Sequence, residues 1–424
     1  MTQTEPAAPV ADDAATSASL SEADVEQAKQ IAGHYFASSM KEHFTAATRD
    51  SIRNFAEGYG DDNPLYCDED YGAGTHWGAQ IAPPMIPIAV NQVLLGDKRP
   101  PEMRRPSFRG IHVFISGSAW EWFQPVRPGD ELYTFDGYES VEDKKSEFAG
   151  RSIIITRRHV RMNQRGEVVA ISRPIAIHTE RKAARKSGKY SAFQPATYTP
   201  ADIEAIDAIY AAETIRGGEP RYWEDVTVGE ELQPRAKGPL TVTDIIVFHS
   251  GGYGFTPYKP CTGRIAYRNR QRIGAFYVPD EHGVPDVAQR VHWDTAWAKQ
   301  VGVPSAYDYG MLRDCWLSHL ITDWMGDDGW LMSFSSQLRR FNYLGDNHII
   351  TGEVTGKRIE DGRYLVDISL RGTNQRGEIT CPATATVALP SRAAGAVVLP
   401  EPPADIAEQA RQMLDRHLEL RAQR

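Results

Sequence analysis

The sequence has few cysteines and no long hydrophobic run. No CxxC pair occurs, so neither a zinc knuckle nor a disulfide framework is indicated, and we expect reduced thiols in a cytoplasmic protein. No apolar stretch reaches the roughly 18 residues that a membrane-spanning helix needs. The four cysteines lie far apart in the 424 residues, as Cys67, Cys261, Cys315 and Cys381.

Several functional signatures are missing as well. The glycines of 250–255 (SGGYGF) do not form GxGxxG, and the chain has neither a Walker A sequence nor a Gly-x-Ser-x-Gly elbow. The acidic residues Asp323, Asp327 and Asp328 lack the spacing and the closing glutamate of a calcium loop, so we expect no metal site. The formal net charge of -9 argues against nucleic acid and anionic membranes as partners.

What the sequence does contain is an internal repeat. Residues 163–167 (NQRGE) recur at 374–378, and each copy lies between two runs of alternating polar and apolar residues. A polar-Arg-Gly segment between such runs predicts a β-hairpin. Upstream of the hairpins, 127–143 (RPGDELYTFDGYESVED) and 343–362 (YLGDNHIITGEVTGKRIEDG) match in the same order. Two ordered matches indicate the duplication of a domain.

Each half is predicted to place helices before its strands. In the first half we expect helical stretches near 52–56 and at 85–95, and in the second half at 243–249 and 310–324. A long apolar helix combined with an antiparallel sheet predicts an α+β fold in which the sheet wraps the helix.

Composition divides the chain into five parts. Residues 1–22 are rich in Ala, Pro, Asp and Ser and have no basic start before an apolar run, so we expect a disordered tail rather than a signal peptide. The remaining parts are a first domain at 23–182, a charged and Pro-rich linker with room for a short helix at 183–219, a second domain at 220–392 and a C-terminal helical tail at 393–424.

Four segments carry a resemblance to a known family. In the first half these are 59–72 (YGDDNPLYCDEDYG) and 78–87 (GAQIAPPMIP), and in the second half 221–252 and 292–311 (HWDTAWAKQVGVPSAYDYGM). They resemble the MaoC-like dehydratases and (R)-specific enoyl-CoA hydratases, with a dehydratase-like first half. The resemblance implies a tandem double hot-dog, in which a curved antiparallel sheet wraps a long central helix in each half. It also implies reversible addition of water to an enoyl-CoA thioester.

The first half departs from the family pattern at two places. In the family an Asp and a His hold the water, and a backbone N–H at the start of the central helix binds the thioester oxygen. Asp61 and Asn63 match the family, but Tyr66 stands at the His position, and Pro83 and Pro84, which have no N–H, stand at the helix start. We therefore expect this half to accommodate substrate without catalysis, with Asp61 and Asn63 in structural turns.

The second half carries the catalytic positions of the family. His292 falls on the family His, and Gly310 falls on the Gly of the helix start, so the Gly310 N–H is the expected oxyanion donor. Tyr309 and Met311, on either side of Gly310, are expected to contact the substrate.

The family Asp has no direct counterpart in the second half. Val287 occupies its position, and we predict that Asp286, one residue earlier, is the catalytic partner of His292. His249 and His282 are rival partners. His319, like these two rivals, has no motif around it and is interpreted as a structural histidine.

An insertion at 251–285 separates these elements in the second half. Its arginines Arg264 and Arg268 are predicted to bind the phosphates of coenzyme A, because guanidinium groups suit phosphate. Three alternatives stay open for the insertion, namely a solvated face over packed tyrosines, a lid over the acyl group and a subunit contact.

We expect the chain to be an enoyl-CoA hydratase or 3-hydroxyacyl-CoA dehydratase of lipid metabolism that acts on a bulky acyl chain. Coenzyme A would be part of the substrate, and no other cofactor is expected. Two alternatives remain, a hot-dog acyl-CoA thioesterase and a non-catalytic partner subunit that binds acyl-CoA. The two halves can pair within one chain, so a monomer or a homodimer of such units fits the sequence.

Overall fold

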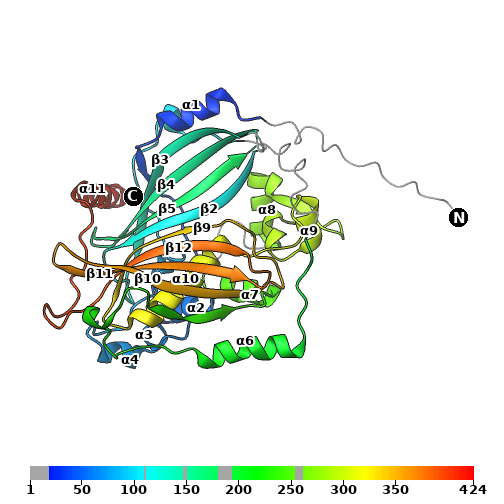
Figure 1. Cartoon of the computed structure of the whole chain (residues 1–424). Coiled ribbons are helices and arrows are strands. Elements are labelled where there is room, and N and C mark those ends of the chain that lie inside the picture. Colours follow the sequence, from blue (N-terminus) through cyan, green and yellow to red (C-terminus); the bar gives the residue numbers. More distant parts are fainter. Residues whose placement is uncertain (1–18, 109–110, 147–149, 180–192, 254–260) are drawn as a thin grey trace, which may run out of the picture.

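The computed structural model describes residues 19–108, 111–146, 150–179, 193–253 and 261–424 (Figure 1). Most of the expected tail at 1–22 lies outside these ranges, as do part of the expected linker (180–192) and part of the insertion (254–260). Within the described ranges, no helix combines the length and the apolar character needed to cross a membrane.

Ten strands form one antiparallel sheet that runs through the whole molecule (Figure 1). Their order is β1-β3-β4-β5-β2-β9-β12-β11-β10-β6, so each block of five strands comes from one half of the chain. The blocks join where β2 pairs with β9, from Gly117 opposite Gln337 to Glu121 opposite Ser333. With its helices, this sheet confirms the predicted α+β class.

The strands are long except at the edges of the sheet. In the first half they are β1 (Tyr35–Ala37), β2 (His112–Trp122), β3 (Leu132–Ser146), β4 (Gly150–Asn163) and β5 (Val168–Thr179). In the second half they are β6 (Glu231–Lys237), β9 (Trp330–Gln337), β10 (His348–Glu360), β11 (Arg363–Asn374) and β12 (Ile379–Ala388). A small separate sheet pairs β7 (Tyr277–Pro279) with β8 (Pro285–Val287).

The repeated sequence NQRGE forms the same turn in both halves, between β4 and β5 and between β11 and β12. In the second copy the Asn374 side-chain oxygen accepts from the backbone N–H groups of Arg376 and Glu378, and its amide donates to the Glu378 carboxylate. Gly377 takes a φ of +75°, which glycine adopts without steric cost. The first copy repeats this with Asn163, Arg165, Gly166 (φ +78°) and Glu167. The predicted hairpins are therefore confirmed.

Among the described residues, a long buried helix is present in the second half and missing from the first. Helix α10 (Gly310–Met325) is buried from Leu312 to its end, as expected for 310–324. The helix expected at 85–95 is wrong, because this segment contains only the short 3-10 turn η1 (Ile86–Ile88) within the described residues. Pro83, Pro84 and Pro87 explain the difference, since proline lacks the N–H of the helix ladder and clashes with the preceding turn.

The remaining helices surround the sheet and α10. They are α1 (Glu22–Gln30), α2 (Arg49–Glu57), α3 (Pro64–Cys67), α4 (Glu69–Gly74), α6 (Pro200–Ala212), α7 (Val242–Ser250), α8 (Gly263–Ile273), α9 (Thr295–Gln300) and α11 (Ala404–Ala422). Short 3-10 turns are η2 (Pro101–Met103), η3 (Trp223–Asp225), η5 (Gly274–Phe276) and η6 (Ala288–His292).

Helices α2 and α7 are equivalent in the two halves. Each begins with a threonine capping box, Thr48 with Ser51 and Thr241 with Asp244, which satisfies N–H groups at the helix start. Each ends at a glycine, Gly58 or Gly251, and the two ends cross so closely that a Cβ at Gly58 would lie 3.2 Å from the Gly251 Cα. This pairing joins the halves beneath the sheet.

The last helix of the chain returns to the first half. Ile406, Ala410 and Leu414 of α11 join an apolar cluster with residues of β3, β4 and β5. The His417 Nδ1 atom accepts a hydrogen bond of 2.8 Å from the backbone N–H of Leu95. Helix α11 therefore covers part of the first-half sheet (Figure 1).

Candidate active site

The first turn of α10 presents an uncapped helix start. Tyr309 is the N-cap residue, and its side chain makes no capping hydrogen bond to the helix. Gly310 is the first helical residue, so its N–H lies among the groups that have no partner inside the helix and carry partial positive charge. A Cβ at position 310 would lie 2.3 Å from Cδ1 of Leu338, so a larger residue would crowd this turn.

The Tyr309 hydroxyl group lies between two side chains from other elements. Gln289 of η6 donates its Nε2–H to the Tyr309 oxygen at 2.8 Å, and His249 near the end of α7 lies 2.6 Å from the same oxygen through Nε2. Burial raises the pKa of Tyr309 far above its usual value and lowers the pKa of His249 to about 4. Both side chains are therefore neutral near pH 7, and Tyr309 is held in place by its neighbours.

His292, at the end of η6, lies against Tyr309. The two ring centroids are 3.9 Å apart, and His292 as a whole residue keeps some exposure to solvent. Its Nδ1–H donates to the Tyr307 carbonyl oxygen at 2.8 Å, which leaves Nε2 as the basic atom of the ring. Burial lowers the pKa of His292 to about 4. The imidazole is thus a free base at neutral pH, close to the start of α10.

The structure does not place Asp286 in hydrogen-bond contact with His292 within the described residues. Asp286 lies in β8, where its carboxylate accepts from the Cys261 thiol at 3.2 Å and from the Val287 N–H at 2.7 Å. The role of Asp286 stays a prediction. Asp294, two residues after His292, caps α9 by accepting from the Trp297 N–H at 2.9 Å.

The predicted phosphate ligands Arg264 and Arg268 are exposed on α8, one turn apart. Other arginines line a groove beside the start of α10, which we call the arginine groove. About 1510 Å³ of space is unfilled there, and its walls include Phe114, Arg313, Leu338, Arg339, Arg340, Phe341 and Arg376. Phe341 contacts Tyr307, with ring centroids 4.6 Å apart, and so links the groove to His292.

The arginines of this groove differ in their partners. Arg313 lies 3.0 Å from the Asp308 carboxylate, and Arg376 makes two contacts to Asp346, at 2.7 and 2.6 Å. Arg339 donates to the Gln337 side-chain oxygen at 2.9 Å, and Arg340 lies 3.9 Å from Glu378. Since Arg339 and Arg340 are exposed and not closely paired with carboxylates, they are the better placed to meet an anionic ligand.

In the first half, Asp61 and Asn63 occupy the structural turns expected for them. Asp61 accepts from the Asn63 N–H at 3.0 Å and from the Tyr59 hydroxyl at 2.8 Å, and Asn63 caps α3 through the Leu65 N–H. His319 of α10 lies 3.6 Å from Asp61, so the family Asp of the first half faces the second-half helix.

His319 belongs to a fully buried polar cluster. It accepts at Nδ1 from Lys237 at 2.8 Å and donates from Nε2 to Asp323 at 3.0 Å, while Arg235 pairs with Asp323 at 2.9 Å. Asp61, His319 and Asp323 offer ligand atoms within 4.8 Å of one another, a spacing that could hold a cation. Arg235 and Lys237 already supply two positive charges beside Asp61, Asp323 and the neighbouring Glu213, so cations of the protein itself occupy this cluster.

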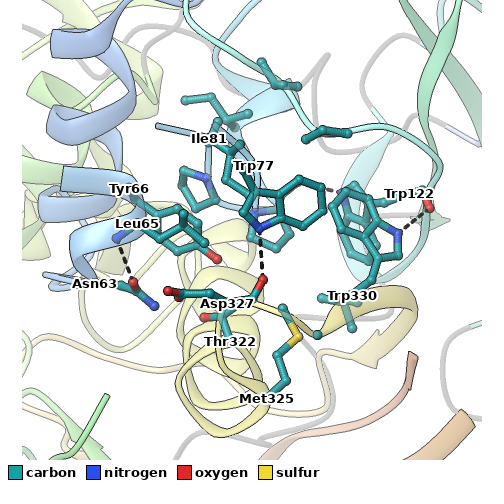
Figure 2. Close-up of a pocket in the computed structure, with 18 of the residues that line it drawn as sticks. Asn63, Leu65, Tyr66, Trp77, Ile81, Trp122, Thr322, Met325, Asp327 and Trp330 are labelled. Carbon is teal, nitrogen blue, oxygen red and sulfur yellow. Dashed lines mark hydrogen bonds between the residues drawn. The ribbon is translucent and has the colours of Figure 1, made fainter. Parts of the chain in front are cut away.

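A second hollow lies where the first half would have its catalytic centre, and we call it the tryptophan pocket. Atoms leave about 560 Å³ unfilled there, and the lining includes Trp77, Trp122, Trp330, Tyr66, Pro84 and Met325. Figure 2 shows the three indole rings on one side and Tyr66 and Asn63 on the other, with the end of α10 between them. Tyr66 and Pro84 therefore line the same pocket, whereas His292 of the second half lies against Tyr309, the residue before Gly310.

Sequence reasoning missed several of these residues. Gln289 precedes His292 by one 3-10 turn, which puts both on one side of η6. A single Gln outside a motif does not indicate a functional site, so the sequence could not predict this contact. His249 was considered only as a rival partner, and its place at the C-terminal end of an apolar helix was the available clue. Arg339 and Arg340 follow a strand without any motif, and only the fold brings them beside the start of α10.

Comparison with known proteins assigns the family. Residues 33–172 match the family described as FAS1-like, dehydratase domain region. A UPF0336 protein of Streptomyces avermitilis is 30% identical over 135 residues, which cover 31% of this chain and 85% of that protein. The chain therefore belongs to the MaoC-like dehydratases, with a FAS1-like dehydratase region in its first half.

Two further similarities are more distant. A protein of Thermomonospora curvata named probable enoyl-CoA hydratase alpha subunit is 27% identical over 132 residues, which cover 29% of this chain and 41% of that protein. The solved structure of a MaoC-like dehydratase aligns with a TM-score of 0.56 at 17% identity, over 84% of this chain and 98% of that chain. At this identity the structural match supports the fold alone.

Proposed function

We propose that the chain is an enoyl-CoA hydratase, or a 3-hydroxyacyl-CoA dehydratase in the reverse direction, and that its second half is catalytic. The observation that carries this proposal is the neutral His292, whose Nδ1–H is bound to the Tyr307 carbonyl and whose Nε2 is left basic beside the uncapped start of α10. The relative named as an enoyl-CoA hydratase supports the substrate class.

In this mechanism His292 Nε2 takes a proton from water as the water oxygen bonds to C3 of the enoyl thioester. The Gly310 N–H stabilises the negative charge that develops on the thioester oxygen. The proton then passes to C2, so that one water is added and His292 returns to its neutral form. Tyr309 and Met311, which flank Gly310, contact the thioester in this proposal.

The second group that holds the water is either Asp286 or the Tyr309–His249 pair. Asp286 is the sequence-based candidate, whereas Tyr309 lies in ring contact with His292 and is bonded to His249. Substitutions D286A and H249A, assayed separately for kcat, decide between them. Loss of turnover in one variant and not in the other assigns the role.

We further propose that the chain folds as two hot-dog units, at 23–182 and 220–392, and that coenzyme A lies along the arginine groove. The groove is basic, opens beside the start of α10 and contacts the His292 site through Phe341. Arg264 and Arg268 of α8 remain the alternative phosphate ligands.

The test is a panel of trans-2-enoyl-CoA thioesters, from crotonyl-CoA to branched and ring-bearing acyl groups. Loss of the conjugated thioester absorbance, with a mass gain of one water, supports the hydratase. A preference for the larger acyl groups supports the expected bulky substrate. Release of free CoA would instead establish a thioesterase, and binding without turnover would establish a partner subunit.

A further inference from the structure

The tryptophan pocket lies at the opposite end of α10 from His292. Its second-half wall includes Thr322 and Met325, near the end of that helix, whereas Gly310 is the first residue. At about 1.5 Å per residue, the twelve residues from Gly310 to Thr322 span about 18 Å along the axis. Among the described residues, the pocket and the arginine groove have no lining residue in common. The two hollows are therefore separate.

The walls of the pocket are rigid aromatic rings. Each indole N–H donates to a backbone oxygen, from Trp77 to Asp327 at 2.9 Å, from Trp122 to Pro84 at 2.7 Å and from Trp330 to Trp122 at 3.0 Å (Figure 2). The Trp77 and Trp330 ring centroids are 5.7 Å apart. Since the N–H groups are fixed by the backbone, these side chains offer the pocket apolar surface that suits a flat ring.

One polar atom at the pocket has no hydrogen-bond partner among the described residues. Asp327 lines the pocket and is 4% exposed, and its Oδ2 accepts from the Tyr71 hydroxyl at 2.7 Å. Its Oδ1 is buried and has no hydrogen bond in the described part of the chain. A buried oxygen without a hydrogen-bond donor lowers the stability of the folded protein, because it has lost its water and gained no partner. A ligand hydroxyl that donates to this oxygen would offset that loss on binding. Burial also raises the pKa of Asp327.

We propose that the tryptophan pocket is a second, non-catalytic binding site for a neutral, ring-bearing molecule that carries a hydroxyl group. The rings of Trp77, Trp122 and Trp330 bind the apolar ring, and Asp327 accepts from the hydroxyl. The site goes beyond the proposed hydration and does not depend on it. It lies where the first half has Tyr66 and Pro84 in place of a catalytic base and an oxyanion donor.

Calorimetric titration of the whole chain with 2-naphthol tests this site in the absence of any acyl-CoA. We expect 2-naphthol to bind more tightly than 2-methoxynaphthalene, whose hydroxyl is blocked, and than the anionic 2-naphthoate. A82L fills the pocket with a larger side chain and should weaken binding at least about tenfold. The matched control A275L makes the same change on an exposed turn and should leave binding intact.

A second variant covers the case in which A82L does not fold, as judged by near-ultraviolet circular dichroism. D327L keeps a side chain of similar size but removes both acceptor oxygens, and it should abolish the preference for 2-naphthol over 2-methoxynaphthalene. No binding, or binding unchanged in both variants, would overturn the proposal. Displacement of 2-naphthol by a ring-bearing acyl-CoA but not by CoA would also overturn it, because the pocket would then hold the distal end of the substrate.

Discussion

The two halves of the molecule share a scaffold and differ in what the scaffold holds. The repeated turns have the same hydrogen bonds around Asn163 and Asn374, and in each half the neighbouring Gln donates to the Asp of the preceding Gly-Asp turn, Gln164 to Asp130 and Gln375 to Asp346. These residues support the backbone of long hairpins. The same residues therefore shape the sheet at these turns in both halves.

The side chains at the two sites differ in their chemistry: those of the second half are basic, and those of the first half are aromatic or apolar. The second half has His292 and Gly310 beside a basic groove, whereas the first half has Tyr66 and Pro84 beside a pocket of tryptophans. A proline at the helix start removes both the N–H donor and the helix itself. The difference teaches that prolines at a helix start can change both the core of a half and the pocket beside that core.

The largest expected effect is the loss of the second-half base. H292A should lower kcat by about 10²–10⁴-fold, the usual range for a general base. His282, a rival partner in the sequence, is exposed in the structure beside Glu281, so H282A gives the control and should keep its kcat. The kcat of both variants is measured from the steady-state rate of crotonyl-CoA hydration. Adding Y66H to H292A should not restore turnover, since the first half has prolines where the oxyanion donor should be. Recovery in the double variant would contradict this contrast between the halves.

The buried cluster that joins the halves should dominate stability. R235A leaves the Asp323 carboxylate buried without its cationic partner and should cost about 3–5 kcal/mol of unfolding free energy. Urea unfolding followed by circular dichroism measures the loss. The surface pair of Arg416 and Asp97 supplies the control R416A, which should unfold as the parent protein does. Equal midpoints for the two variants would show that the cluster does not hold the halves together.

The pH dependence should separate His292 from an ordinary histidine. Because its pKa is lowered to about 4, the ring stays a free base as pH falls, and kcat/KM should decline only near pH 4 rather than near the usual value of about 6.5. The buried His319 has a folded pKa of about 3, so its contribution to stability is complete above about 6.5 and is lost as pH falls below that value. Circular dichroism at each pH therefore accompanies the rates, and an apparent pKa near 6.5 in folded protein would remove His292 as the base.

The arginine groove should account for binding of coenzyme A. R339Q with R340Q should raise KM about tenfold with little change in kcat, because phosphate contacts hold the substrate equally before and during reaction. The matched pair on α8, R264Q with R268Q, should change KM much less. Measuring KM at low and high salt adds a check, since the parent should lose affinity with salt more steeply than the groove variant. The reverse ranking would move the phosphates to α8.

The smallest effect should appear at the repeated turns. G377A and G166A both place a side chain at a positive φ and should each cost about 1–2 kcal/mol. G166A should be the more costly, because a Cβ there lies 3.3 Å from Leu414 of α11, whereas nothing lies within 4 Å at Gly377. Thermal unfolding measures the loss of stability in each variant. Equal losses would mean that α11 shifts away from the new Cβ without a loss of stability.

Much of the fold could be predicted because its signals are local. Alternation around the two NQRGE segments predicted the hairpins, and helical spacing predicted α2, α7 and α10. The helix predicted at 85–95 is wrong because the prediction relied on the apolar residues of this segment. Pro83, Pro84 and Pro87 prevent the helix, since proline cannot donate the backbone hydrogen bond that a helix needs. The candidate site was predicted only where a motif is contiguous, at His292 and at Tyr309 to Met311.

The sequence by itself determined the class of protein, the two repeated hairpins and the start of the long helix at Gly310, since each depends on residues close together in the chain. Only the tertiary structure decided that His249 and Gln289 meet at Tyr309, that Asp61 faces His319, and that one half has an arginine groove and the other a tryptophan pocket. These contacts join segments far apart in the sequence, and their partners are chosen by packing rather than by any local pattern.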